Sequence, residues 1–260
     1  MKQINNDYDS LAHLWWAEDE GAAASIRYLV NPVRFTYFKN LLERQFAAGF
    51  ERKKALDVGC GGGFLSEELC RIGLNVSGID PSRESINIAN QHAIKSRLPI
   101  EYREAFGEAL PFDDGTFDMV FCCDVLEHVG NIQKVISEIS RVLKTGGLFF
   151  FDTINRTLIS RIAVIYFMQK CRYTSFAPKD THVWQMFIKP DELKSILSKN
   201  RIFLHDMKGI APEHINPLII IDLYKASRKK ISYKELAQRL NFTESNDLES
   251  SYMGYGTKQS

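Results

Sequence analysis

A glycine-rich loop between an apolar strand and a helix constrains the fold of this chain more than any other feature. Residues 55–58 form a short, mostly apolar run that leads directly into Gly-Cys-Gly-Gly-Gly at residues 59–63. Residues 64–73 then repeat leucine and isoleucine at the i, i+4 and i+7 positions, which predicts a helix. Glycines at such a turn remove side chains where a ligand must approach the backbone closely. The loop lacks both the G-x-G-x-x-G spacing of a dinucleotide site and the lysine of a P-loop.

The segments on either side of this loop alternate between strand and helix. Further strands are predicted at 75–79, 100–103, 117–123 and 148–151, and helices at 85–93 and 132–143. This alternation predicts βαβ units, and therefore an α/β fold with a largely parallel sheet and helices on both faces. Gly146 and Gly147 are expected to end the helix at 132–143. Later in the chain we expect a helix at 191–199 and two closing strands at 202–207 and 252–257.

The composition is that of an ordinary globular protein. The 260 residues are 45% hydrophobic, and 33 Lys and Arg balance 32 Asp and Glu to a net charge of +1. A protein that binds nucleic acid without sequence preference usually carries a basic excess, so no nucleic-acid partner is expected. The five cysteines form no C-x-x-C pair, which argues for a reducing compartment and against a cysteine zinc site. We see no signal peptide and no apolar run near the roughly 20 residues that span a bilayer, and expect a soluble, cytoplasmic protein.

An acidic residue at the end of the second strand adds the second half of a ligand site. Asp80 follows the glycine loop by one helix and one strand. An acid in this position can accept hydrogen bonds from the ribose hydroxyls of a nucleoside. The glycines alone could form no more than a tight turn, but together with Asp80 they predict a nucleoside-containing ligand.

Residues 56–63 with Asp80 resemble the S-adenosylmethionine (SAM) site of class I methyltransferases, and residues 108–112 and 143–147 are similar to other stretches of that class. The resemblance implies a Rossmann-like sheet, mostly parallel with an antiparallel closing strand. It also implies SAM as cofactor and S-adenosylhomocysteine (SAH) as product. Phe106 stands where many of these enzymes carry an acid facing the adenine, so an adenine contact is expected instead from the backbone near Gly107. The cofactor-binding residues that we expect are Arg34, Asp57, Gly59, Gly61, Gly63, Asp80, Pro81, Phe106, Gly107 and Cys123.

More of the chain resembles one branch of that class, the ubiquinone-biosynthesis O-methyltransferases. The matching stretches occur in the same order over nearly the whole chain, and include residues 15–16, 31–34, 58–63, 126–129, 153–157, 181–182 and 187–193. The resemblance implies methylation of a catechol-type hydroxyl on a prenylated aromatic ring. Two departures are Asp124, where the family usually has Glu, and a basic, helical-looking insert at about 218–248 with Arg228, Lys229 and Lys230. The family also has Met at the position of Cys123.

Three parts of the chain are expected from these patterns. Residues 1–50 are predicted to form an amphipathic helical cap, with a break at Pro32. Residues 51–155 form the SAM-binding Rossmann-like core, and residues 156–260 supply a substrate lid, the insert and the closing strands. The adjacent Trp15 and Trp16 either cover the cofactor or only pack in the cap.

The chemistry is expected just after the fourth strand. A phenol must lose its proton to react well with a methyl donor, through a general base or through a divalent metal. Glu127 and His128, with His182 as a second base, are the candidate catalytic residues. If a helical turn begins at Asp124, then Asp124, Glu127 and His128 share one side and could bind Mg²⁺ or a softer divalent ion. The ubiquinone branch is associated with metal dependence, but the same residue types also occur in metal-free methyltransferases.

An apolar stretch after the fifth strand is the remaining signal. Residues 158–168 are mostly apolar, and basic residues follow, so the segment 158–180 could contact a membrane surface or act as a lid or subunit contact. The expected partner is a small aromatic substrate, with a lipophilic tail as one possibility. Two other functions stay open: a class I methyltransferase with a nitrogen or carbon acceptor, and a membrane-associated protein that binds SAM or SAH without catalysis.

Overall fold

One eight-stranded sheet organises the computed structural model, which describes residues 9, 12–17, 21–47, 49–178, 180–213 and 218–260. The strand order is β3-β2-β1-β4-β5-β8-β6-β7. The strands are β1 (Lys54–Val58), β2 (Asn75–Asp80), β3 (Glu101–Glu104), β4 (Phe117–Cys123), β5 (Leu143–Ile154), β6 (Ile202–Pro212), β7 (Phe242–Ser245) and β8 (Ser251–Lys258). β1 to β5 run parallel, whereas β8 pairs antiparallel with both β5 and β6. The predicted α/β sheet with an antiparallel closing strand is therefore confirmed.

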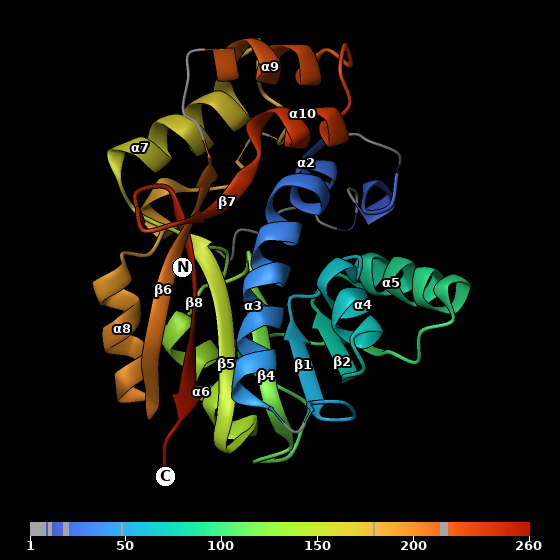
Figure 1. The fold of residues 1–260 in the computed structure, drawn as a ribbon, viewed down its shortest axis with the longest axis vertical. Helices are drawn as coiled ribbons and strands as arrows, with labels where there is room; N and C mark the ends of the chain where they lie inside the picture. The colour runs from blue at the N-terminus through green and yellow to red at the C-terminus, as the bar shows by residue number, and fades with distance from the viewer. Residues whose placement is uncertain (1–8, 10–11, 18–20, 48, 179, 214–217) are drawn as a thin grey trace.

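The helices lie on both faces of this sheet and above one end of it (Figure 1). The helices that follow the strands are α4 (Phe64–Arg71), α5 (Arg83–Ser96), α6 (Ile132–Val142) and α8 (Pro190–Lys199). The N-terminal part contains the 3₁₀ turn η1 (Ala12–Leu14), α2 (Gly21–Ser25), the π-helix η2 (Ile26–Val30) and α3 (Asn31–Gln45). The later part contains α7 (Leu158–Ser160), the π-helix η3 (Arg161–Lys170), the 3₁₀ turn η4 (Trp184–Met186), α9 (Leu218–Ser227) and α10 (Tyr233–Leu240).

Side chains alternate between the two faces of the sheet along each strand, and this alternation divides the core into two layers. Leu56 and Val58 of β1 belong to the cluster that packs against α6 and α8, whereas Ala55 belongs to the cluster that packs against α3 and α4. Neighbouring side chains on a strand point to opposite faces, and a strand covered on both faces is therefore apolar at successive positions. The same division places Phe121 of β4 against α3, and Val120 against α6. The doubly covered sheet explains why β4 could be predicted at its exact bounds.

Three elements differ from the sequence predictions. The strand predicted from Leu148 begins at Leu143, so Gly146 and Gly147 lie inside β5 and do not separate it from α6. Leu143 already pairs with Phe117, and a register shift follows before Met119 pairs with Leu148. Pro32 breaks no helix, because it occupies the first turn of α3, where its missing N–H costs no hydrogen bond.

The third difference lies in the insert. The insert looked helical from its sequence, and it does contain the helices α9 and α10, but it also contains the edge strand β7, which pairs antiparallel with β6. Parts of the predicted cap at 1–50, and Lys179 in the predicted membrane segment, lie outside the described residues.

A helical cap covers the carboxyl ends of the parallel strands (Figure 1). The cap combines α2, η2, α7, η3, α9 and α10, and its helices meet where Leu29 packs with Tyr233 and Leu236. Among the helices that the structure describes, none combines the length and the apolar character needed to cross a bilayer. Open α/β sheets bind ligands at the carboxyl ends of their strands, so the space beneath the cap is where a site is expected.

The stacked aromatic pair in the central sheet gives a test of this core. Phe121 is fully buried and stacks on Phe150 with ring centroids 4.7 Å apart. Replacing Phe121 with alanine should lower the free energy of unfolding by about 3–5 kcal/mol, because a large cavity forms between β4 and α3. Ile94 on α5 is 77% exposed, so Ile94→Ala should lower the free energy of unfolding by no more than about 0.5 kcal/mol. Urea unfolding of both variants measures the difference, and equal losses would contradict the assigned core.

Candidate active site

The glycine loop turns sharply from β1 into α4. Gly59, Gly61 and Gly63 have φ values of 74°, 51° and 90°, in the left-handed region that glycine adopts without steric cost. The amides of Gly59 and Cys60 both donate to the carbonyl of Ile79 at the end of β2, at 2.8 and 2.9 Å. Gly63 is the residue that caps the N-terminus of α4. The loop is therefore fixed to the neighbouring strand, with its backbone exposed to the space above the sheet.

Asp80 is tied to this loop by its own carboxylate. One oxygen accepts from the amide of Gly61 at 2.9 Å, and the other accepts from the amide of Ser82 at 2.9 Å. Burial raises the pKa of Asp80 to about 6, with smaller contributions from nearby Asp57 and Asp9 and with the two backbone hydrogen bonds acting against it. Each carboxylate oxygen retains a lone pair, and Asp80 lines the cavity described next. Its position suits acceptance of hydrogen bonds from a diol.

A cavity of about 1790 Å³ lies between the sheet and the cap. Of the residues expected to bind the cofactor, Gly63 alone is missing from its wall. The lining includes Arg34, Asp57, Gly59, Gly61, Asp80, Pro81, Phe106, Gly107 and Cys123. Phe106 is 50% exposed at this wall, although it is a large aromatic side chain. The structure thus gathers these residues at one cavity, which is the geometry that the cofactor interpretation requires.

Trp15 and Trp16 lie against the glycine loop. The Trp15 indole donates to Ser85 Oγ at 2.9 Å, and the Trp16 indole donates to the carbonyl of Gly62 at 2.7 Å. A side chain at Gly61 or Gly62 would collide with Trp15, so these glycines allow the indole to approach the backbone. Trp15 also lines the cavity. Trp15 therefore packs against the glycine loop and also faces the cavity, and its covering of the cofactor stays a prediction.

Asp57 lies on β1 at the base of the glycine loop and bonds to the helix that follows the loop. It is buried on β1, and its carboxylate accepts from the Ser66 hydroxyl of α4 at 2.6 Å. Burial raises its pKa to about 6, although the bonds from Ser66 and the charge of Arg34 act in the opposite direction. Asp57 therefore joins the strand to the helix on either side of the glycine turn.

A buried arginine joins helix α3 to the ends of two strands. Arg34 of α3 lies 2.5 Å from Asp124 and 3.0 Å from Asp152 of β5. Burial acts to lower the pKa of Arg34, but the charges of Asp152 and Asp124 outweigh it and raise the pKa above its ordinary value. Asp152 also accepts from the amide of Asp124 at 2.8 Å. Sequence reasoning missed Asp152, because a single acid inside an apolar strand carries no spacing signal.

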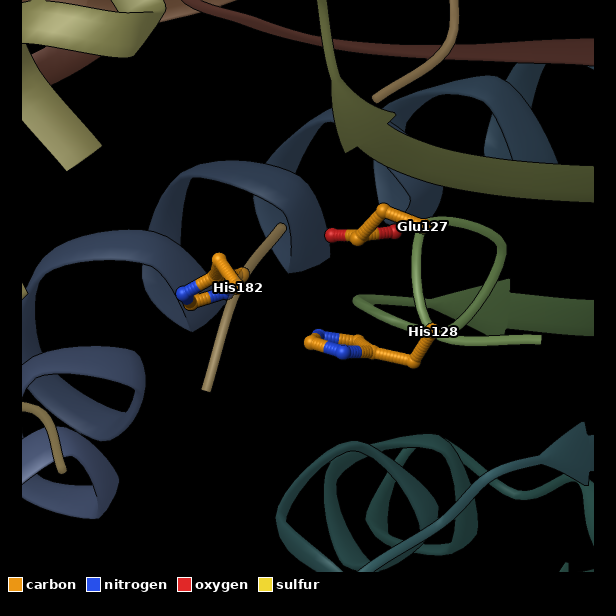
Figure 2. A group of neighbouring side chains, drawn as sticks. All are labelled: Glu127, His128 and His182. Atoms are coloured by element: carbon orange, nitrogen blue, oxygen red, sulfur yellow. The ribbon is translucent and has the colours of Figure 1, made fainter. Parts of the chain in front are cut away.

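Glu127, His128 and His182 form a cluster near the ends of β4 and β5. One potential ligand atom from each lies within 4.8 Å of the others. Figure 2 shows Glu127 and His128 on one turn and His182 on a separate segment, with the three side chains facing a common space. His128 and His182 line the cavity, and their ring centroids are 4.9 Å apart. Residues from two distant parts of the chain therefore meet at the cavity.

The Glu127 carboxylate has one oxygen paired and one unpaired. Oε2 accepts from the Thr153 hydroxyl at 2.8 Å, while Oε1 is buried with no hydrogen-bond partner among the described residues. Burial, and next the charge of Asp124, raise the pKa of Glu127 to about 8. A buried, unpaired carboxylate oxygen is costly, and such a group is normally satisfied by a proton, a water or a cation.

Both histidines of the cluster are held in their neutral forms. Burial lowers the pKa of His128 to about 3, with a further effect of His182, and burial lowers the pKa of His182 to about 4. Nδ1 of His182 lies 3.1 Å from Oε1 of Gln169, which can only accept, so Nδ1 carries the hydrogen and Nε2 keeps a lone pair. The neutral imidazole is the form in which histidine binds metal ions.

The predicted metal set of Asp124, Glu127 and His128 differs from this cluster. The chain after β4 forms a turn, not a helix, and Asp124 adopts a left-handed backbone conformation with φ of 55°. Its carboxylate consequently bonds to Arg34, and His182 takes the third position. Asp124, Glu127 and His128 were expected to share one side only if a helical turn began at Asp124. The backbone is not helical there, so this condition is not met.

Comparisons with known proteins agree with this geometry. A family model described as "Methyltransferase domain" matches residues 56–151. The ubiquinone biosynthesis O-methyltransferase of Pelagibacter ubique is 36% identical over 219 residues, which cover 81% of this chain and 89% of that protein. The protein of the same name from Haemophilus ducreyi is 38% identical over 222 residues, covering 84% and 89%. These relatives confirm the resemblance inferred from the sequence motifs.

Solved structures agree in fold. The magnesium protoporphyrin IX methyltransferase of Synechocystis, determined with bound SAM, has a TM-score of 0.53 at 16% identity, covering 86% of this chain and 79% of its own. The YcgJ protein of Bacillus subtilis has a TM-score of 0.57 at 18% identity, covering 85% and 99%. At such low identity these likenesses support the Rossmann-like methyltransferase fold and nothing finer.

Asp80 offers the sharpest test of the cofactor position. Replacing Asp80 with asparagine removes a charged acceptor, and hydrogen bonds to charged groups contribute about 1.5–3 kcal/mol. The Kd for SAM and for SAH should therefore rise about 10- to 100-fold, as measured by titration calorimetry. Asp114→Asn is the matched control, because that side chain is 80% exposed and bonds to Arg141. Unchanged affinity in the Asp80 variant would remove the carboxylate from the cofactor site.

Proposed function

The chain belongs to the ubiquinone biosynthesis O-methyltransferase family of SAM-dependent enzymes, and from that premise we propose that its acceptor is a catechol-type hydroxyl on a prenylated aromatic ring. The names of its relatives support this substrate class. The observation that carries the proposal is the cluster of Glu127, His128 and His182, whose two histidines line the same cavity as the glycine loop. A methyl donor and groups able to handle a hydroxyl proton can thus face one acceptor.

The chain's own residues have separate tasks in this reaction. The glycine loop and Asp80 hold the methyl donor, with the ribose at the carboxylate of Asp80. Holding donor and acceptor in line can lower the activation free energy by several kcal/mol, and by about 7–11 kcal/mol at most. The acceptor hydroxyl would lie by His128 and His182, and a phenol with a pKa of about 10 must lose its proton there. Cap helices above the cavity exclude water from the reacting atoms.

We propose further that Glu127, His128 and His182 bind a divalent cation. The unpaired buried Oε1 of Glu127 and the two neutral imidazoles fit such a group. Two nitrogen donors and one carboxylate suit Zn²⁺, Mn²⁺ or Fe²⁺ better than Mg²⁺, which prefers oxygen ligands and water. A bound cation would lower the pKa of a coordinated hydroxyl. In the alternative without metal, one of the imidazoles takes the proton directly.

The test is methyl transfer from labelled SAM to 4-methylcatechol and to prenylated catechols, with amine and carbon acceptors in parallel. Wild-type enzyme should methylate the catechols, lose at least about tenfold in rate after chelation, and recover when Zn²⁺ or Mn²⁺ is restored. Glu127→Gln should lower both the rate and the metal content measured by mass spectrometry. Glu43→Gln, at a side chain that is 55% exposed, should change neither.

Each part of this proposal can fail separately. Transfer only to amine or carbon acceptors would overturn the catechol assignment. Catechol turnover that survives extensive chelation unchanged would overturn the metal and leave a histidine as the base.

We propose that one end of the cap contacts a membrane surface. Large apolar side chains are exposed there on α7, η3 and α9, namely Leu158, Ile159, Ile162, Tyr166, Leu218 and Ile221. The segment after η3 meets the end of α9, where the Ser227 hydroxyl donates to the carbonyl of Tyr173 at 2.7 Å. Arg172 follows η3, and residues 228–230 follow α9, so basic residues flank both apolar segments. Apolar area beside basic charge favours anionic lipid surfaces.

Sedimentation with lipid vesicles tests this contact. Binding should be stronger to phosphatidylcholine mixed with phosphatidylglycerol than to phosphatidylcholine alone, and should weaken with salt. Leu158→Asp combined with Tyr166→Asp should lower binding about tenfold or more, because two exposed apolar anchors are lost. Ile94→Asp on α5 is the control, since it changes an equally exposed apolar side chain outside the cap. Binding that ignores both lipid charge and the cap variants would contradict the proposal.

A further inference from the structure

The cavity is larger than the methyl donor requires. Its volume of about 1790 Å³ compares with about 300–1,000 Å³ for pockets that hold drug-sized ligands. The residues expected to hold the donor, such as Gly59 and Asp80, occupy one part of the wall. The same cavity continues past His128 and His182 to the helical insert. Space therefore remains for a second, extended ligand that reaches the reacting centre.

The wall contributed by α9, α10 and β7 is made of hydrocarbon side chains only, and the one charged lining residue of the insert, Asp247, lies in the loop after β7. α9, α10 and β7 supply Ile219, Ile220, Leu223, Leu236, Leu240 and Phe242. Across the cavity, η3 supplies further apolar residues, among them Ala163 and Phe167. A wall without a charged or hydrogen-bonding side chain selects ligands by burial of apolar surface.

Several apolar residues of α9 are exposed in the part of the chain that the structure describes. Residues 218–223 of α9 are apolar except for Asp222, yet Ala226 is the only residue of the helix that is fully buried. A helix with apolar residues around most of its circumference is normally buried. Leu218 and Ile221 lie outside the cavity lining, whereas Ile219, Ile220 and Leu223 are part of it. The inner side of α9 thus presents an apolar surface to the cavity.

We propose that η3, α9, α10 and β7 form a binding site for a long hydrocarbon tail attached to the ring that is methylated. The continuity of the cavity identifies the occupant, because a ligand lying on α9 shares one space with the glycine loop and with His128 and His182 of the cluster. In Figure 1, α9 and α10 lie above the carboxyl ends of the parallel strands, so the tail leads away from the sheet. The inference rests on the proposed function, and it assigns to the insert the recognition of tail length.

The first test compares 4-methyl-, 4-hexyl- and 4-decylcatechol as acceptors. In the wild-type enzyme KM should fall about two- to fourfold for each methylene that becomes buried, until the tail leaves the cavity. Leu223→Trp and, independently, Ala163→Trp should fill the apolar part of the cavity. Each should lower the ratio of kcat/KM for decyl- over methylcatechol at least tenfold. Lys225→Trp adds the same side chain to α9 outside the cavity lining, and should preserve the wild-type ratio.

A second test separates tail binding from turnover. The dimethyl ether of 4-decylcatechol has no hydroxyl to methylate, and its binding can be measured by calorimetry with SAH present. We expect binding to the wild-type and Lys225→Trp proteins, and at least tenfold weaker binding to the Leu223→Trp and Ala163→Trp proteins. If no catechol is methylated but this pattern of binding holds, the proposed acceptor is wrong and the tail site stands. If methylcatechol is methylated while tail length changes neither KM nor binding in the wild type, the tail site is overturned.

Discussion

The buried guanidinium of Arg34 is the contact on which the arrangement of the site depends. It bonds to Asp124 at the end of β4 and to Asp152 in β5, and so joins helix α3 to the two central strands. Breaking a buried ion pair by removal of one partner commonly costs about 3–5 kcal/mol, because the remaining charge loses its compensation. Asp124 itself has a left-handed backbone conformation, and the turn that carries Glu127 and His128 follows it directly. His128 of that turn lines the cavity, and Glu127 is buried beside it within reach of His182.

The sequence was most informative where a residue's neighbours in space are also its neighbours along the chain. β4 was predicted at its observed bounds because both faces of that strand are buried, which makes its sequence apolar throughout. The glycine turn was found because its positions need glycine, either for a positive φ or because a Cβ would collide with a neighbouring side chain. Prediction failed where distant segments decide the outcome. β7 is an edge strand of four residues with little burial, and it exists because β6 offers an unpaired edge. β5 extends back to Leu143 for a similar reason, since Phe117 of β4 is available as a partner.

In the candidate site, too, the residue types could be predicted from the local sequence, whereas contacts between distant segments could not. Glu127, His128 and His182 were all identified from residue type and from family resemblance. Their grouping was not, because the position of His182 depends on Gln169, which accepts from the His182 amide at 2.5 Å. No periodicity links η3 to residue 182. Asp152 and Ser85 were missed because each is a common residue in an unremarkable local sequence, and each contributes only through a partner far away in the chain, Arg34 and Trp15 respectively.

The position of β8 has a consequence for how this protein reaches its native state. β8 pairs between β5 and β6, although it lies almost a hundred residues after β5 in the sequence. On a ribosome, the edge of β5 must therefore wait, with its ladder of N–H and C=O groups unpaired, until residues 251–258 have been synthesised. Contacts of such large sequence separation slow folding, and open strand edges recruit other chains. Nascent chains of this protein thus pass through a stage in which an apolar, phenylalanine-rich edge is accessible, and it is at this stage that chaperones have most to protect.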